Sequence, residues 1–160
     1  MCRRVTRCSV CGHGVDCGRM IDGANVELIR DAFSAGNRAA ETGGLDDWLS
    51  FFSEDIVWEA VEDAPDAGTY RGHQGICGYL QDWLDTVDGF RGELRDLTAV
   101  GDCVVADTRI NARVKGTDNE MAFDYSQASL IENGKITHIK EFRDHNEAIA
   151  YAEASQRGGA

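Results

Sequence analysis

The residues whose types best suit proton transfer are two carboxylates and a histidine: Asp63, His73 and Glu141. Carboxyl and imidazole groups act as general acids and bases, and burial raises the pKa of a carboxyl toward neutrality. Each residue also has an ordinary structural role. His73 follows Gly72 at an expected helix start and fits a capping role, while Glu141 lies two positions before Arg143 and fits an ion pair. If Glu141 and Arg143 both point inward, we expect a function for them, because burying charge is costly.

Helical periodicity dominates the first half of the chain. Apolar residues recur at helical spacing over residues 25–41 and 73–87, and a shorter helix is expected over 45–52. An alternating strand is expected at 55–61, followed by an acidic loop that contains the single proline, Pro65. Asp63 therefore lies in a loop, and His73 lies at the start of a helix.

The second half alternates with a period of two. Strands are expected over residues 90–100, 103–115, 121–131 and 135–143, with strong turn signals at Gly101-Asp102 and Asn133-Gly134. Asp144 and Glu147 have the spacing of a capping box that opens a final helix reaching about residue 152. Helices followed by an antiparallel meander predict an α+β fold.

Alternation divides the strand over residues 103–115 into two faces. The apolar face should meet the helices. The other face carries Asp107, Arg109 and Arg113, and we expect it to face water or a second copy of the chain. For the last strand the pattern alone leaves open which face lines the interior.

Composition limits the partners. The 160 residues suit one domain, which we place at residues 20–155, with a frayed tail at 156–160. A net charge of −12 argues against nucleic acid and anionic membranes. No apolar run is long enough to span a bilayer, and the N-terminus lacks the apolar core of a secretory signal. We therefore expect a cytoplasmic protein.

The first 19 residues differ sharply from the rest. They hold four of the six cysteines, and Cys8-x-x-Cys11 has the spacing of a zinc turn with Cys2, His13 and Cys17 as further ligands. No second close-spaced pair follows, and nothing around the motif favours a redox site. We interpret residues 1–19 as a disordered basic tail or a mis-assigned start before Met20, and we expect no metal.

Two segments carry a resemblance to a known family. They are DIVWEAVEDAPDAGTYRGHQGI at residues 55–76 and NGKITHIKEFRDHNEA at residues 133–148. Together they resemble the SnoaL-like branch of the nuclear-transport-factor-2-like superfamily, over roughly residues 26–152. The resemblance implies a cystatin-like α+β roll: a cone-shaped, curved antiparallel sheet wrapped around three helices from the N-terminal half, with a short C-terminal helix.

The resemblance also implies a single pocket inside the cone, with the odd-numbered residues of the last two strands facing it. Such a pocket would be mostly apolar, as is usual for small-molecule sites, and would need no cofactor. Asp63, His73 and Glu141 are then the candidate proton carriers. The expected ligand-binding residues are Trp58, Tyr70, Trp83, Phe123, Tyr125, Gln127, Ile139 and Arg143. Members of the superfamily commonly pair through the sheet, so a homodimer is expected.

The known chemistries of the superfamily fit unequally. Ketosteroid isomerase needs one aspartate as the catalytic base and a second aspartate as a hydrogen-bond donor. Their positions fall at Ala60 or Asp63 and at Gln127. We therefore do not expect that activity. The aspartates and arginine of limonene epoxide hydrolase are matched here only by Asp107 and Arg109. These residues lie on the strand face that we expect to point outward, so we do not expect that activity either. A polyketide cyclase-like reaction fits without being required. Two functions stay open: a cofactor-free isomerase, cyclase or hydrolase for an apolar or aromatic molecule, and a non-catalytic ligand-binding or dimerisation module.

Overall fold

The computed structural model describes residues 17–62 and 66–158. Asp63 and the cysteines Cys2, Cys8 and Cys11 lie outside the described residues. The helices and strands are α1 (Cys17–Thr42), α2 (Asp46–Leu49), β1 (Phe52–Glu59), β2 (Thr69–Arg71), α3 (Gly72–Thr86), β3 (Val87–Val100), β4 (Cys103–Val114), β5 (Glu120–Glu132), β6 (Lys135–Phe142) and α4 (His145–Gly158).

The strands form one curved, unclosed sheet, and the predicted α+β fold is confirmed. Their order is β2-β1-β6-β5-β4-β3. The strands β3 to β6 make the predicted antiparallel meander. The sheet is mixed rather than antiparallel throughout, because the meander leaves β6 running in the same direction as β1, and the two pair in parallel.

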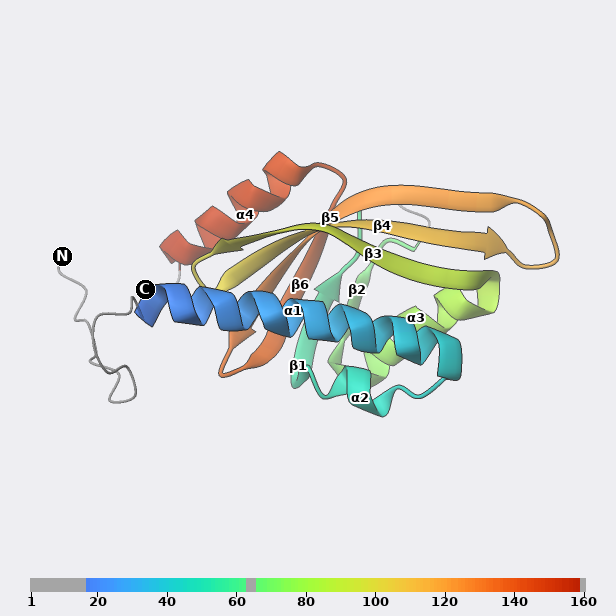
Figure 1. Cartoon of the computed structure of the whole chain (residues 1–160), viewed down its shortest axis with the longest axis horizontal. Coiled ribbons are helices and arrows are strands. Elements are labelled where there is room, and N and C mark those ends of the chain that lie inside the picture. Colours follow the sequence, from blue (N-terminus) through green and yellow to red (C-terminus); the bar gives the residue numbers. More distant parts are fainter. Residues whose placement is uncertain (1–16, 63–65, 159–160) are drawn as a thin grey trace.

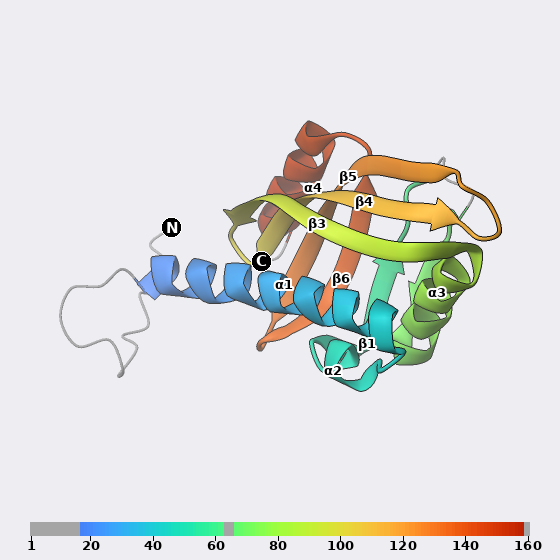
Figure 2. The same cartoon turned by 45° about the vertical axis from the view of Figure 1, so that its right-hand side comes forward.

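The helices lie on both faces of the sheet. The long α1 crosses the concave face, α3 lies at one end of it, and α4 lies on the opposite, outer face (Figures 1 and 2). Two irregularities of the pairing bend β3, the first between Asp88 and Arg91, where Gly89 takes a positive φ of 62°. The sheet therefore curves around α1 instead of lying flat.

One side chain fixes α1 against β3. The amide group of Asn37 donates to the carbonyl of Gly92 at 2.9 Å and accepts from its N–H at 2.8 Å. A Cβ added at Gly92 would contact the ring of Phe33 at 3.4 Å, so the two elements pack closely here. This clamp holds one wall of the concave interior.

The ends of several elements differ from prediction. The first helix begins at Cys17, before the expected residue 25, and the helix expected over 45–52 is only α2, since β1 already begins at Phe52. The short β2 was not predicted, because its three residues lie in a loop-like sequence at the edge of the sheet and pair only with β1. The last helix continues to Gly158, beyond the expected end near residue 152 and into the segment expected to fray.

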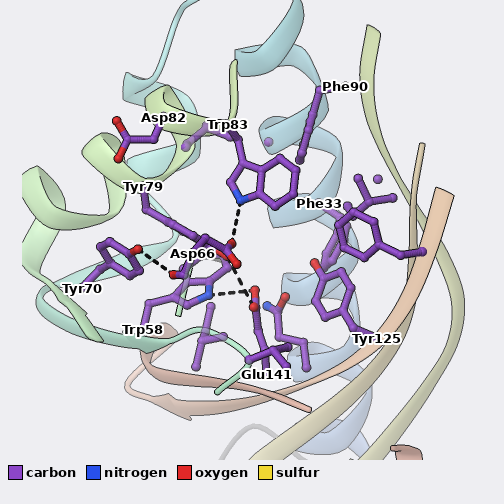
Figure 3. Close-up of a pocket in the computed structure, with 18 of the residues that line it drawn as sticks. Phe33, Trp58, Asp66, Tyr70, Tyr79, Asp82, Trp83, Phe90, Tyr125 and Glu141 are labelled. Carbon is purple, nitrogen blue, oxygen red and sulfur yellow. Dashed lines mark hydrogen bonds between the residues drawn. The ribbon is translucent and has the colours of Figure 1, made fainter. Parts of the chain in front are cut away.

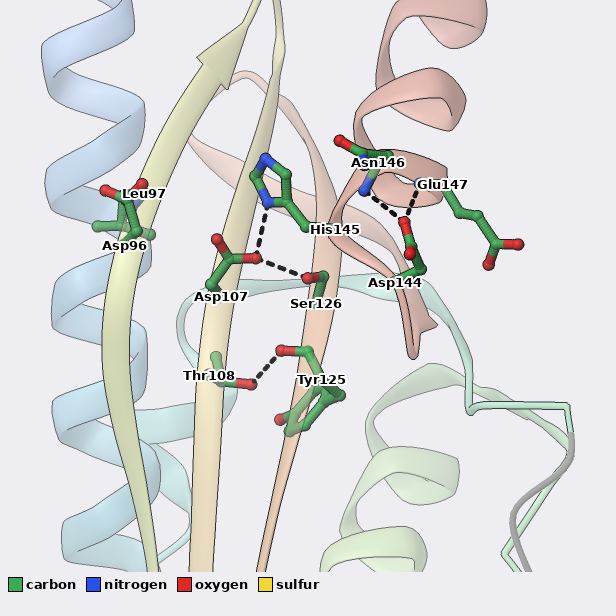
Figure 4. Close-up of polar contacts among 10 residues, drawn as sticks. All are labelled: Asp96, Leu97, Asp107, Thr108, Tyr125, Ser126, Asp144, His145, Asn146 and Glu147. Atoms are coloured by element: carbon green, nitrogen blue, oxygen red, sulfur yellow. Dashed lines mark hydrogen bonds and ion pairs between the residues drawn. The ribbon is translucent and has the colours of Figure 1, made fainter.

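The outer face of the sheet is only partly exposed. At one end of β4 and β5 the small residues of α4 bury a second apolar cluster: Cys103, Val105, Ala128, Ala148 and Ala152. The capping role of Asp144 is confirmed, because its Oδ1 accepts from the backbone N–H of Asn146 at 2.7 Å and of Glu147 at 3.1 Å (Figure 4). None of the described helices is long and apolar enough to cross a membrane.

Candidate functional site

The concave interior holds a cavity of about 770 Å³. All the layers around it contribute: α1, α2, α3, the segment between β1 and β2, and all six strands of the described sheet. Trp58, Tyr79 and Trp83 gather around Asp66 and Glu141, while Tyr125 lies on another side of the space (Figure 3). The size and the largely aromatic wall are those of a pocket for a small organic molecule.

Glu141 is the buried acid of the cavity, with 9% of its surface exposed. Its carboxyl accepts from Trp58 Nε1 at 3.0 Å, because β1 and β6 are neighbouring strands. The pKa of Glu141 is raised to about 7, chiefly by burial and also by the charge of Asp66, while hydrogen bonds from Trp58, the Val61 backbone and Tyr79 oppose the shift. A carboxyl with a pKa near 7 can both give and take a proton at neutral pH.

A tyrosine joins Glu141 to a second carboxylate. The hydroxyl of Tyr79 donates to Asp66 Oδ2 at 2.8 Å and lies 3.4 Å from Glu141 Oε2. A phenol has one proton, and the shorter contact identifies Asp66 as its acceptor. The longer contact to Glu141 is therefore the weaker of the two.

Aromatic contacts order this side of the cavity. Tyr70 stacks on Tyr79 with ring centroids 4.4 Å apart, and Trp58 lies 5.7 Å from Tyr79. The indole of Trp83 stacks on Phe123 at 5.7 Å, and its Nε1 donates to Asp66 Oδ2 at 2.9 Å. The rings therefore hold the carboxylates through their N–H and O–H groups while they offer an apolar wall to a ligand.

Two polar residues of β5, Gln127 and Tyr125, line the cavity. Gln127 is 4% exposed, and its Oε1 accepts no hydrogen bond within the described part of the chain. Burial raises the pKa of the neighbouring Tyr125 phenol, so it stays protonated and can donate. Buried polar groups are nearly always paired, so the acceptor on Gln127 is open to a donor from water or from another molecule in the cavity.

The structure brings most of the predicted site residues to the cavity. Glu141 lines it, together with all of the expected ligand-binding residues: Trp58, Tyr70, Trp83, Phe123, Tyr125, Gln127, Ile139 and Arg143. The odd-numbered faces of β5 and β6 thus look inward. Arg143 is exposed, and no ion pair joins it to Glu141 among the described residues.

His73 is not among the residues that line the cavity, so the structure gives no support to its predicted catalytic role. Its Nε2 lies 3.0 Å from the carbonyl oxygen of Phe52. The part of α3 that lines the cavity begins six residues later, at Tyr79, which is about 9 Å further along the helix axis. Asp63 lies outside the described residues and has no placement to report.

Asp66 and Tyr79 were missed by the sequence reasoning. Tyr79 lies three residues after Ile76 and four before Trp83, so the periodicity of α3 already places it on their face. Asp66 is different, because nothing in the acidic loop separates it from its neighbours Glu62 and Asp63. Only the three-dimensional contacts identify it.

A second polar cluster lies on the outer face of the sheet. Asp107 Oδ1 accepts from Ser126 at 2.6 Å and lies 2.9 Å from His145 Nδ1 (Figure 4). The ion pair between Arg109 and Asp124, 3.1 Å apart, lies beside them. As predicted, Asp107 and Arg109 face away from the interior. An epoxide hydrolase-like site built on them is therefore not available to a ligand in the cavity.

Residues 31–139 match the family of SnoaL-like domains. The chain belongs to that family. An NTF2-like protein from Burkholderia xenovorans LB400 is 28% identical, with 82% of this chain and 96% of that one covered and a TM-score of 0.61. A Jannaschia sp. CCS1 protein assigned as a SnoaL-like polyketide cyclase is 15% identical, with coverages of 89% and 99% and a TM-score of 0.68.

A protein of ketosteroid isomerase-like fold from Catenulispora acidiphila DSM 44928, solved in complex with trimethylamine, is 13% identical to this SnoaL-like chain. The match covers 79% of this chain and 92% of that one, with a TM-score of 0.62. At such identities the two more distant structures report on the fold alone. No curated protein matches the sequence.

The hydrogen bond from Trp58 yields a direct prediction. Trp58→Phe removes a donor that favours the ionised form of Glu141, so the pKa of Glu141 should rise above its value of about 7. We expect a rise of about one pH unit. The measurement is a pH titration of the Glu141 carboxyl carbon by NMR. Trp48→Phe is the control, because Trp48 lines the cavity without bonding to Glu141; equal titrations in the two variants would contradict the assigned role of Trp58.

Proposed function

We propose that this SnoaL-like protein is a cofactor-independent enzyme that transfers protons to and from a small apolar or aromatic molecule, as an isomerase, cyclase or hydrolase does. Glu141 acts as the acid and base. The observation that carries the proposal is a carboxyl 9% exposed, in the wall of a 770 Å³ cavity, with a pKa of about 7. A structural ion pair would explain Glu141 without chemistry, but Arg143 is not its partner.

The surrounding groups suit removal of a proton next to a carbonyl. Ionised Glu141 takes the proton from carbon, and the electron pair moves to the carbonyl oxygen as an enolate. The phenol of Tyr125 is a donor in the same cavity and can stabilise that oxygen. Returning the proton to another carbon gives isomerisation, and attack of the enolate carbon on a second carbonyl gives ring closure.

The test uses an enolisable aromatic ketone, 2-tetralone, in D₂O. NMR follows deuterium incorporation at the carbon next to the carbonyl, and tryptophan fluorescence measures binding of the same ketone. We expect exchange faster than in buffer, rising with pH to a plateau above about 7, because the ionised form of Glu141 is the base. Binding of the ketone without exchange would favour the alternative of a non-catalytic ligand-binding module.

We also propose that the protein forms a homodimer through the outer face of β3, β4 and β5. Beyond α4 this face carries exposed or half-exposed charges of both signs, among them Arg95, Arg113 and Asp124, which suit a self-complementary interface around a two-fold axis. Light scattering at micromolar concentration should give twice the mass of the chain; a monomer mass would contradict the interface. The cytoplasmic location expected from the sequence stays a prediction.

A further inference from the structure

We propose that the cavity selects ligands that carry a protonated amine on an apolar body, with Asp66 as the residue that binds the ammonium group. This inference rests on the proposed function and names the class of molecule that the same site takes.

The charges of the wall favour a cation. Among the described residues that line the cavity, four are acidic and one is basic: Asp66, Asp82, Asp124 and Glu141 against Arg143. Of these, Asp82, Asp124 and Arg143 are exposed, and Asp124 pairs with Arg109 on the outer face. The charged groups left inside the cavity are the half-buried Asp66 and the buried Glu141, both acidic. An anionic ligand would meet excess negative charge inside a partly closed apolar space, where charges are poorly screened. A protein with a net charge of −12 also attracts cations from solution.

The free hydrogen-bonding positions are acceptors. The indole of Trp83 and the phenol of Tyr79 both donate to Oδ2 of Asp66, which leaves Oδ1 without a partner in the part of the chain described. Gln127 contributes its unpaired Oε1 from β5. Carboxylate and amide oxygens that lack donors are best completed by N–H groups of the ligand, and a hydrogen bond between an ammonium and a carboxylate is stronger than a neutral one.

The aromatic rings complete the case. Tyr70, Tyr79, Trp58 and Trp83 surround the two carboxylates, and aromatic rings attract cations that have lost their water (Figure 3). Asp66 supplies the opposite charge, so Glu141 remains available for proton transfer. Because the Tyr79 hydroxyl contacts both carboxylates, an amine at Asp66 lies close to Glu141.

The test compares three probes with the same phenyl group: 2-phenylethylamine, 2-phenylethanol and 3-phenylpropanoate. Quenching of tryptophan fluorescence at pH 7 gives their dissociation constants. We expect the amine to bind about tenfold more tightly than the alcohol, and the carboxylate to bind most weakly. Asp66→Asn should weaken binding of the amine about tenfold and so remove its preference over the alcohol. Asp118→Asn is the control, because it changes the net charge equally from an exposed turn outside the cavity wall.

Two results would overturn the inference: an alcohol that binds as tightly as the amine, or a carboxylate that binds most tightly. Both results are dissociation constants measured with the unmodified protein, so the test of the amine preference does not depend on whether a variant folds. The proposed function is decided separately by exchange of the neutral ketone 2-tetralone. If the three probes bind equally but deuterium exchange of 2-tetralone depends on Glu141, only the amine preference is contradicted. If the amine binds most tightly but the exchange does not depend on Glu141, only the proton-transfer role is contradicted.

Discussion

Glu141→Gln should abolish most of the deuterium exchange of 2-tetralone while the ketone still binds. Glutamine has nearly the same shape, and its carbonyl oxygen can still accept from Trp58. It cannot take up a proton at neutral pH. Because positioned acids and bases contribute about 10²- to 10⁴-fold to a rate, we expect a loss of that order, measured by NMR at pH 8 with saturating ketone.

Two further variants make this result specific. Glu141→Asp keeps the carboxyl but withdraws it from Trp58 and Tyr79, so we expect partial activity. Glu132→Gln makes the same chemical change at an exposed position at the end of β5, and should leave exchange unchanged. An exchange rate in Glu141→Gln equal to that of the unmodified protein would exclude Glu141 as the base.

The same substitution should stabilise the fold above neutral pH. The pKa of Glu141 is about 7 in the folded protein against 4.5 for an unperturbed carboxyl, so the folded state holds this proton more tightly than the unfolded state does. The corresponding stability is fully present below about pH 4.5 and is lost as the pH rises through 7. The shift corresponds to about 3 kcal/mol.

Denaturant unfolding at pH 5 and at pH 8 measures this effect. We expect the free energy of unfolding of Glu141→Gln, relative to the unmodified protein, to increase by up to about 3 kcal/mol between the two conditions. Glu132→Gln should show no such change. Parallel stability curves for Glu141→Gln and the unmodified protein would mean that Glu141 ionises in the folded state as it does in the unfolded chain. Loss of activity together with gain of stability would identify Glu141 as a group kept for function.

Much of the fold could be predicted because its signals are local. Helical and alternating periodicity located the long elements, and the Asn133-Gly134 turn fixed the last hairpin. The parallel pairing of β1 with β6 leaves no such local signal, because the two strands lie some eighty residues apart in the sequence. The hydrogen bond between Trp58 and Glu141 depends on this pairing. The three-residue β2 was missed because it is too short to show an alternating pattern.

The candidate site divides in a similar way. Residues on strands, such as Tyr125, Gln127 and Glu141, follow from alternation once the resemblance states which face looks inward. Asp66 could not be found, because a loop has no period and its role comes from distant donors on α3. The position of His73 in the sequence predicts that it lies at the start of α3, but not how far that residue lies from the cavity.

The two carboxylates differ in what holds them. Glu141 is fixed on β6 by the ladder of the sheet, whereas Asp66 lies in the connection between β1 and β2. If Asp66 selects the ligand and Glu141 carries the proton, as proposed, changes of sequence or length in that connection would alter which molecules bind without moving Glu141. Recognition and reactivity would then lie on separate parts of the fold, and related chains could acquire new ligands through one short segment.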